Sequence, residues 1–360
     1  MKLKHLDLFS GIGGFHLGFQ KAGFELETYF SEIDKYAIDV YKHNFKNSKY
    51  VGSVTDIQSK DLPKIDLITF GSPCQDFSLA GKRKGMQGAK SSLISEAIRL
   101  ISECRPRFFV WENVKGTFSS NNSEDFWAII QAFTNIGGYR LEWQLLNTNW
   151  FLPQNRERIY LVGYIGEKSG KEIFPIKENA KKINELQRQQ ANTNTLTTRY
   201  TATGSGSYIT ERKFIPQEIG DYRYDEGFRW RKDNNSPTLT LLSSKIYIKS
   251  NTKSGYETAI PGDAINLSNL NSKTRRGRVG KQQSQTLDTA CNMGVYSNKI
   301  RRLTPLECER LQGFPDNWTK KGCKDLISDG QRYKMCGNAV TVDVVEAVAK
   351  KIKSNFNYVI

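Results

Sequence analysis

The first stretch of the chain, MKLKHLDLFSGIGG at residues 1–14, carries a short apolar run that leads directly into a glycine-rich turn. Similar apolar runs recur along the first half of the chain, and segments with helical spacing lie between and after them. This alternation is typical of a parallel sheet wrapped by helices. We therefore predict strands near 4–9, 26–31, 65–70 and 107–112, and helices near 14–22, 34–45, 92–104 and 124–135.

Two further apolar runs, RLEWQLLN near 140–147 and RIYLVGYI near 158–165, follow without a helix between them. They predict a hairpin that closes the sheet. From about 176 to 300 the chain turns to Asn, Ser, Thr, Gln and Gly with short β-like pieces. This change of texture predicts a second, smaller domain of mostly β and irregular structure.

The end of the chain has a different pattern, because apolar residues return there at four-residue spacing. This spacing predicts one apolar helix face that packs back on the first domain, formed by Val340, Val344, Val348 and Ile352. We therefore expect a discontinuous core, with domains at 1–175 and 176–329 and a returning segment at 330–360.

The chain of 360 residues is strongly basic, with a formal net charge of +16 and a pI near 9.4. Residues 176–300 hold 20 lysines and arginines against 11 acidic residues, and NSKTRRGRVGK at 271–281 is their most basic segment. A field of this sign favours a polyanionic partner, with nucleic acid first. Charge alone leaves open a merely basic soluble protein. On the nucleic-acid interpretation, Arg275, Arg276 and Arg278 are candidate contacts.

Several classes of protein are disfavoured by what the sequence lacks. No run of about 18 apolar residues exists and no cleavable signal opens the chain, so we expect an intracellular protein. The six cysteines form no Cys-x-x-Cys pair, which argues against a zinc site or a disulfide framework. All three histidines lie within the first 43 residues, which argues against a hydrolase triad.

The glycine-rich turn contains Phe9, Gly11, Gly13 and Gly14 directly after the first strand. Glycines at this position let the backbone approach a ligand closely, and Glu32 at the end of the second strand can accept hydrogen bonds from ribose hydroxyls. The pattern therefore favours a nucleoside cofactor, although a tight structural turn would need the same glycines. Histidine replaces the third glycine of the dinucleotide fingerprint at position 16, which weakens a nicotinamide enzyme.

The segment GSPCQ places Cys74 immediately after the apolar run IDLITF. A thiol at the carboxyl end of a central strand lies in the crevice where α/β sheets bind ligands. An isolated buried cysteine would behave as a small apolar residue. The glycine-rich, basic segment that follows, with Lys82, Arg83 and Lys84, instead suggests a loop that closes over an anionic strand.

Two more motifs bring charged groups to the same sheet edge. FFVWENV ends a predicted strand in Glu112, and QNRER begins the closing strand with Arg156 and Arg158 at alternate positions, so both point to one face. A solvated cluster of salt bridges is the simpler explanation of the arginines.

Taken together, these motifs resemble the DNA cytosine-5 methyltransferase family of the bacterial and phage restriction-modification type. DLFSGIGGF is similar to its cofactor loop, SPCQDFS to its nucleophile motif, ENV to its acid motif and QNRER to its arginine motif. RRLTPLECERLQGFPDNW and GNAV resemble its last two motifs, although we assign no chemistry to the turn at 313–316. The resemblance implies a Rossmann-like α/β sheet that binds S-adenosyl-L-methionine, with a smaller β or irregular target-recognition domain at 176–329.

The resemblance also implies roles for individual residues. Cys74 would add to carbon 6 of cytosine, a protonated Glu112 would donate to N3, Arg158 would hold the base carbonyl and Arg156 a backbone phosphate. The implied cofactor site comprises Phe9, Gly11, Gly13, Gly14, Glu32, Ile33, Asp56, Ile57, Pro73, Leu93, Asn338 and Val340. From charge, motif position and, for Thr286, the resemblance, the predicted DNA contacts comprise Gln75, Ser78, Lys82, Arg83, Lys84, Arg275, Arg276, Arg278 and Thr286.

The target carbon is inaccessible inside a duplex, so the cytosine must swing out of double-stranded DNA into the pocket. We expect a monomer in the cytoplasm of a bacterial or phage-infected cell, without metal or membrane. A restriction endonuclease acting on the same site is a candidate partner. Two alternatives stay open, namely the same chemistry on tRNA and a catalytically inactive DNA-binding module.

Overall fold

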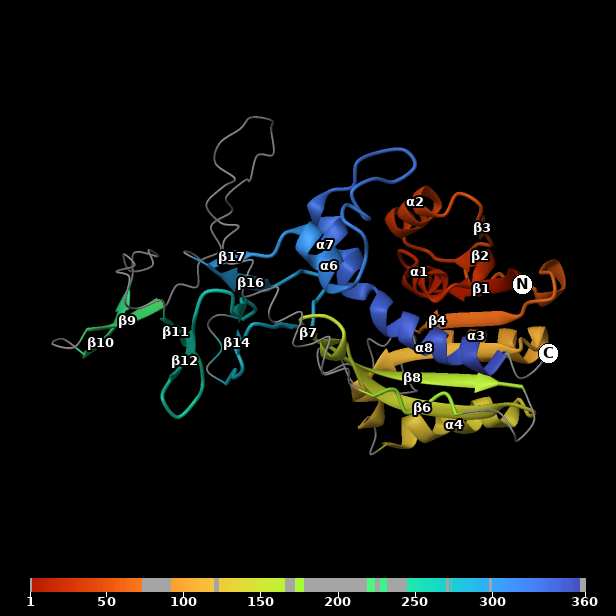
Figure 1. The fold of residues 1–360 in the computed structure, drawn as a ribbon, viewed down its shortest axis with the longest axis horizontal. Helices are drawn as coiled ribbons and strands as arrows, with labels where there is room; N and C mark the ends of the chain where they lie inside the picture. The colour runs from red at the N-terminus through yellow and green to blue at the C-terminus, as the bar shows by residue number, and fades with distance from the viewer. Residues whose placement is uncertain are drawn as a thin grey trace.

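The computed structural model describes residues 2–72, 92–119, 123–165, 172–177, 219–223, 227–231, 245–269, 272, 274–297 and 300–356. Within these residues the chain forms a mixed α/β unit and a smaller β-rich part, which lie at opposite ends of the molecule in Figure 1. The fold class predicted from the sequence is therefore confirmed.

A seven-stranded sheet with the order β3-β2-β1-β4-β5-β8-β6 organises the larger unit. Strands β3, β2, β1, β4 and β5 run parallel, whereas β8 is antiparallel to both β5 and β6. The strands are β1 (Lys2–Leu8), β2 (Glu25–Ser31), β3 (Lys49–Tyr50), β4 (Leu67–Gly71), β5 (Phe108–Val114), β6 (Arg140–Asn147) and β8 (Glu157–Tyr164). The predicted strands and closing hairpin are confirmed within two residues, while the short, exposed β3 was not predicted.

Helices cover both faces of this sheet (Figure 1). They are α1 (Gly14–Lys21), α2 (Lys35–Asn44), α3 (Ser92–Cys104), α4 (Glu124–Asn135) and α8 (Val342–Phe356). One apolar cluster joins α1 and α8 to the sheet, and a second joins α3 and α4 to its other face. Val344, Val348 and Ile352 of α8 are buried in the first cluster, as their spacing predicted.

The β-rich region, defined here as residues 245–302, is built from short strands. These are β11 (Ile246–Lys249), β12 (Tyr256–Ala259), β13 (Ala264–Asn266), β14 (Val279–Gly280), β15 (Ser284–Gln285), β16 (Met293–Tyr296) and β17 (Ile300–Arg302). Strands β9 (Ile219–Arg223) and β10 (Gly227–Arg231) extend the sheet that contains β11 and β12. Its own apolar cluster is small and centres on Ile248, Ile265 and Tyr296.

Two connections tie the β-rich region to the larger unit. Strand β15 pairs in parallel with β7 (Gln154–Asn155), which precedes the closing strand β8. Helices α6 (Pro305–Leu311) and α7 (Asp329–Asn338) then lead the chain back to α8, and they lie between the two parts in Figure 1. Helix α6 begins with a capping box in which Thr304 and Glu307 bond each other's backbone N–H.

Candidate active site

The carboxyl ends of the parallel strands β1, β2, β4 and β5 meet at one edge of the sheet. Phe9, Glu32 and Ser72 directly follow β1, β2 and β4. Glu112 lies near the end of β5, two positions before its last residue. Gly71 is directly opposite Glu112 in the β4–β5 register. Three of the motifs found in the sequence therefore converge here because parallel pairing places their strand ends together.

The glycine loop after β1 has a backbone that explains its composition. Gly11 and Gly13 have φ values of 53° and 85°, in the left-handed region that favours glycine. A Cβ on Gly13 would lie 2.3 Å from the Phe45 ring, and one on Gly14 would lie 2.6 Å from Val340 Cγ2. Phe9 also has a positive φ of 50°. The loop is thus shaped by close packing on both sides.

Glu32 is fixed by backbone groups on both of its carboxylate oxygens. Oε2 accepts from Gly11 N at 2.8 Å, while Oε1 accepts from Ile33 N at 2.8 Å and Asp34 N at 2.9 Å. The carboxylate therefore links the glycine loop to the start of α2. A carboxylate offers about four lone-pair sites, so acceptor capacity remains for a hydroxyl of a ligand.

Ser10, inside the same loop, was not found by sequence reasoning. Its side chain is 7% exposed, and its Oγ has no hydrogen-bond partner among the described residues. A buried hydroxyl without a partner is costly unless a ligand or water satisfies it. Ile33, which follows Glu32 in the chain, is an apolar side chain that is 78% exposed.

The remaining cofactor candidates differ in burial. Val340 is buried and packs against Gly14, and a Cβ on Gly71 would lie 3.8 Å from its Cγ1. Ile57 is buried in the α3 cluster, against which Leu93 packs. Asp56 and Asn338 are exposed. Val340 is therefore the candidate that joins the cofactor loop to the strand leading into the nucleophile motif.

Glu112, which is buried, and Arg158, which is partly buried, form an ion pair at this edge. Arg158 Nε lies 3.2 Å from Glu112 Oε1, and their side chains are 16% and 10% exposed. This contact lacks hydrogen-bond geometry, and Oε1 has no hydrogen-bond partner among the described residues. Neighbouring Tyr160 is buried, and desolvation together with the charge of Glu112 raises its pKa. The pair thus holds a carboxyl oxygen with an unused hydrogen-bonding position.

Arg156 lies elsewhere than the sequence suggested. Its side chain is 3% exposed, and its guanidinium donates to Ala339 O at 2.8 Å and Gly337 O at 3.3 Å. A phosphate on the protein surface is not within reach of a buried group in this arrangement. The predicted phosphate contact is therefore corrected: Arg156 holds the end of α7 beside Val340.

Ser72 is a second residue that sequence reasoning missed. Its buried Oγ accepts from Trp111 Nε1 and from Asn113 Nδ2, both at 3.1 Å. Trp111 and Asn113 flank Glu112 on β5. The residue two positions before Cys74 is thereby fixed to the strand that carries the acid. No pattern in the sequence distinguishes this serine, because the contact depends on strand register.

Thr286 is brought to the arginine motif by the pairing of β15 with β7. It is exposed, and its Oγ1 donates to Asn155 O at 2.8 Å. The neighbouring Leu287 N donates to the buried Gln154 Oε1 at 3.2 Å. The structure thus brings Thr286 to the arginine motif, which lies 131 residues earlier in the chain.

The three arginines of the basic segment separate in the structure. Arg276 is exposed and Arg275 half-buried, whereas Arg278 is 2% exposed. The guanidinium of Arg278 donates to Asn269 O at 2.8 Å, Ser268 O at 3.2 Å and Asn266 O at 3.4 Å. The expectation that Arg278 contacts DNA is therefore corrected, because its side chain holds the backbone of this region.

Seven predicted site residues lie outside the described residues: Pro73, Cys74, Gln75, Ser78, Lys82, Arg83 and Lys84. Their roles stay predictions. Ser72 and Leu93 are the described candidates nearest to them in the chain.

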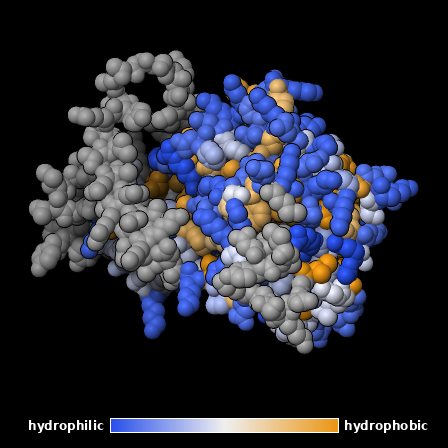
Figure 2. All heavy atoms as spheres, turned by 45° about the vertical axis from the view of Figure 1, so that its right-hand side comes forward, coloured by the Kyte–Doolittle hydropathy of each residue, from blue (hydrophilic) through white to orange (hydrophobic). Residues whose placement is uncertain are grey.

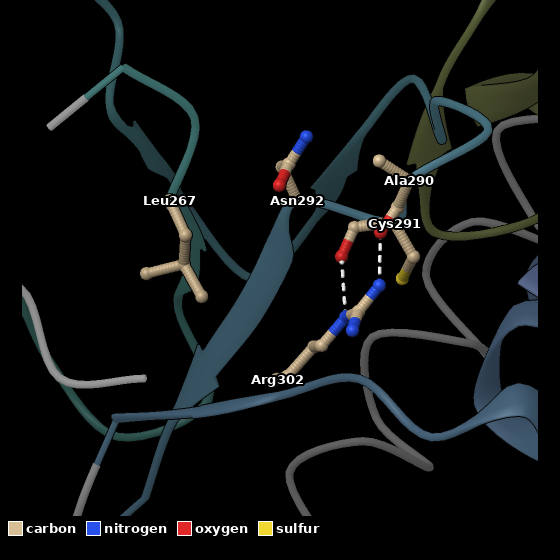
Figure 3. A pocket seen from close by; sticks show the side chains of 5 residues that line it. All are labelled: Leu267, Ala290, Cys291, Asn292 and Arg302. Carbon is tan, nitrogen blue, oxygen red and sulfur yellow. Dashed lines mark hydrogen bonds between the residues drawn. The ribbon is translucent and has the colours of Figure 1, made fainter. Parts of the chain in front are cut away.

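A cavity of about 160 Å³ is lined by Leu267, Ala290, Cys291, Asn292 and Arg302. Figure 3 shows that Arg302 reaches the backbone carbonyls at positions 290 and 291. Its guanidinium also lies 4.2 Å from the Tyr333 ring centroid. None of the lining residues was predicted as a site residue, and the arginine serves the local backbone.

Two other kinds of feature are absent from the part of the chain that the structure describes. No group of three His, Cys, Asp or Glu side chains there could hold a metal ion. Within the same ranges, no helix has both the length and the apolar character needed to cross a membrane. The face shown in Figure 2 is largely hydrophilic where it is coloured.

Comparison with known proteins decides the family. The family model described as C-5 cytosine-specific DNA methylase matches residues 3–354. The chain belongs to this family. It is therefore a DNA cytosine methyltransferase, and the resemblance seen in the motifs is confirmed.

Curated relatives agree with this assignment, and a solved structure shares the fold. The orphan methyltransferase M.SPRI of Bacillus phage SPR is 31% identical, over 98% of this chain and 97% of its own length. The type II methyltransferase M1.ScrFI of Lactococcus lactis subsp. cremoris is 33% identical, over 98% of this chain and 78% of its own. A structure of S. pombe Dnmt2 methyltransferase, at 18% identity, shares the fold with a TM-score of 0.58 over 99% of both chains.

Proposed function

We propose that this methyltransferase acts on cytosine in double-stranded DNA through a covalent bond between Cys74 and carbon 6, with S-adenosyl-L-methionine as methyl donor. The observation that carries the proposal is the Glu112–Arg158 pair, whose Oε1 has an unused hydrogen-bonding position. This pair lies at the sheet edge where the chain enters the nucleophile motif.

The chemistry requires an activated base, because carbon 5 of cytosine is too weak a nucleophile to attack a sulfonium methyl group unaided. Addition of the Cys74 thiolate to carbon 6 converts the ring to an enamine-like species whose carbon 5 can accept the methyl group. A protonated Glu112 would donate to N3 as negative charge develops there. Loss of the carbon 5 proton, with water as the base, then expels Cys74.

Arg158 has a positioning and a binding role in this proposal. Its guanidinium orients Glu112 by the 3.2 Å contact and has further N–H groups to offer the base carbonyl. Arg156 contributes indirectly by holding the carbonyls of Gly337 and Ala339. In this proposal Arg158 contacts the base, whereas Arg156 holds the protein backbone and does not contact DNA.

The residues of the glycine loop fit the proposed cofactor. S-adenosyl-L-methionine supplies a transferable methyl group when bound. Glu32 has remaining acceptor capacity for ribose hydroxyls, Ser10 Oγ lacks a partner among the described residues, and exposed Ile33 could pack on an adenine face. These features suit an amphipathic nucleoside.

DNA binding is proposed for the β-rich region and its surroundings. Arg275, Arg276 and Thr286 are the described candidates, since Arg278 is buried. We assign residues 1–175 and 330–360 to the catalytic domain and 176–329 to target recognition. A restriction-modification setting is proposed because M1.ScrFI is named a type II methyltransferase. M.SPRI is named an orphan methyltransferase, so a partner endonuclease is not common to all the relatives.

The test is substitution of the nucleophile. Cys74→Ser should abolish transfer of tritiated methyl groups to duplex DNA while leaving DNA binding intact, and wild-type protein should form a covalent adduct with 5-fluorocytosine in its own site. Cys323→Ser, at an exposed cysteine, is the matched control. Unaltered turnover by Cys74→Ser, or an adduct through another residue, would overturn the mechanism. Methylation of tRNA in preference to DNA would overturn the substrate.

A further inference from the structure

Trp318, two residues beyond the turn at 313–316, reaches the cofactor loop. Trp318 Nε1 donates to the backbone carbonyl of Ile12 at 3.0 Å, across 306 positions in the chain. Ile12 lies between Gly11 and Gly13, and its side chain is 1% exposed. A single indole N–H thus binds the middle of the loop whose glycines have positive φ.

Aromatic packing fixes the indole against the same loop. The Trp318 ring lies 5.4 Å from the Phe45 ring at 68° and 5.6 Å from the Phe314 ring at 33°. Phe45 in turn fills the space where a side chain on Gly13 would lie. The backbone carbonyl of Trp318 also accepts from Asn44 Nδ2 at 3.1 Å. Trp318 therefore contacts the loop at Ile12, and Phe45, which packs on Trp318, contacts it at Gly13.

The residue after Trp318 is anchored by a buried ionic network. Thr319 N donates to Glu309 Oε1 at 2.9 Å, and Arg332 Nη2 donates to the same oxygen at 3.0 Å. Thr319 and Glu309 are fully buried, and Arg332 is 8% exposed. These contacts join α6, the segment that carries Trp318, and α7, and they hold the indole in place.

We propose that Trp318 is a positioning residue for the cofactor loop. Its N–H holds the Ile12 carbonyl in place, and this keeps the loop in the conformation that receives the cofactor. Binding then does not have to order a loop with several left-handed residues, and preorganisation of this kind strengthens affinity. The identity of the cofactor rests on the function proposed above, whereas the ordering of the loop by Trp318 does not.

The test separates the N–H from the ring. Trp318→Phe keeps an aromatic ring but removes the donor, and benzothienylalanine at position 318 keeps the indole shape and also removes it. Trp143→Phe, at a tryptophan 37% exposed on β6, is the matched control. Binding of S-adenosylhomocysteine by purified full-length protein, without DNA, gives the first readout. Amide hydrogen exchange of residues 9–14 without any cofactor gives the second.

Both donor-free variants should weaken S-adenosylhomocysteine binding about 5- to 10-fold, the scale of one net hydrogen bond, and speed exchange of the loop amides. Affinity for duplex DNA should be unchanged, as should all readouts of Trp143→Phe. Unchanged exchange and unchanged binding in the benzothienylalanine protein would overturn the role of Trp318. Wild-type affinity for S-adenosylhomocysteine tests the proposed cofactor separately from these ratios.

Discussion

In the seven-stranded sheet, strand ladders pair the backbone and a chain of buried polar side chains bond one another. In the β-rich region the ladders are short, and charged side chains also bond the backbone. His5, Thr69, Asp7, Tyr41 and His16 form a chain of side-chain contacts of 2.7 to 3.1 Å beneath the glycine loop. In the β-rich region the strands have only two to four residues.

Three charged side chains supply the missing backbone partners in the β-rich region. Arg278 donates to three carbonyls, Glu257 accepts from the N–H groups of Arg278 and Val279, and Asp263 accepts from those of Ile260 and Gln282. Buried backbone groups need partners wherever ladders are short. The comparison teaches that a buried polar side chain such as Ser72 can support the site in one region, while one such as Arg278 supports the fold itself in the other.

The largest effect should come from removing Arg278. Arg278→Met removes the guanidinium donor from three carbonyls, of which that of Asn269 keeps a hydrogen bond from Ser272 N. It should destabilise the β-rich region by about 2 kcal/mol or more, at about 1–3 kcal/mol for each unsatisfied group. Limited proteolysis should then cut within residues 245–302 before the sheet is attacked. Arg276→Met, at an exposed arginine, is the control and should change little. Equal effects of the two substitutions would contradict the comparison.

An intermediate effect is expected for Ser72, a polar residue that serves the site. Ser72→Ala leaves the N–H groups of Trp111 and Asn113 without their acceptor, which should cost about 1–3 kcal/mol and loosen the chain before Cys74. We expect kcat for methyl transfer to fall about 10-fold, equivalent to about 1.4 kcal/mol, with little change in the KM for the methyl donor. Steady-state kinetics measures both values.

The exposed Ser119→Ala is the control for Ser72, since its hydroxyl donates to the local carbonyl of Gly116 at 3.2 Å. If Ser72→Ala raised KM and left kcat unchanged, the contact with β5 would not position the nucleophile.

The smallest effect should be a change in pH dependence at Asp7. Burial raises the pKa of Asp7 from 3.8 to about 8, with Thr69 and Tyr41 opposing the shift. Because the folded value exceeds the unfolded one, the stabilising contribution is complete below the unfolded value and is lost as pH rises through about 8. Asp7→Asn remains neutral, so wild-type protein should lose Tm relative to this variant as pH rises from 6.5 to about 8, and the difference should level off above that.

Two features isolate this effect. Burial lowers the pKa of both His5 and His16 below 6.5, so these groups stay neutral over the chosen range. Asp61→Asn, at an exposed carboxylate, is the control substitution. A wild-type Tm that tracks Asp7→Asn at every pH would show that Asp7 does not titrate in this range.

The sheet was predictable because its apolar runs and helical spacing report burial directly, and the motif residues lie at predictable strand ends. Residues such as Arg156 and Arg278 were assigned wrongly because a sequence shows that a side chain is charged, not whether it faces water or a backbone carbonyl. The roles of Ser72 and Trp318 could not be predicted, because their partners are distant in the chain. Thr286 could be placed only through its resemblance to a family position.

The last helix, α8, has a consequence for how the molecule is made. Lys353 donates to the carbonyls of Ala22 and Gly23, about 330 positions earlier, and α8 covers apolar side chains of α1. A ribosome adding about 5–20 residues per second needs roughly 15–65 s to travel that distance. Throughout this interval the nascent N-terminal half exposes an uncovered apolar surface to chaperones and to other chains.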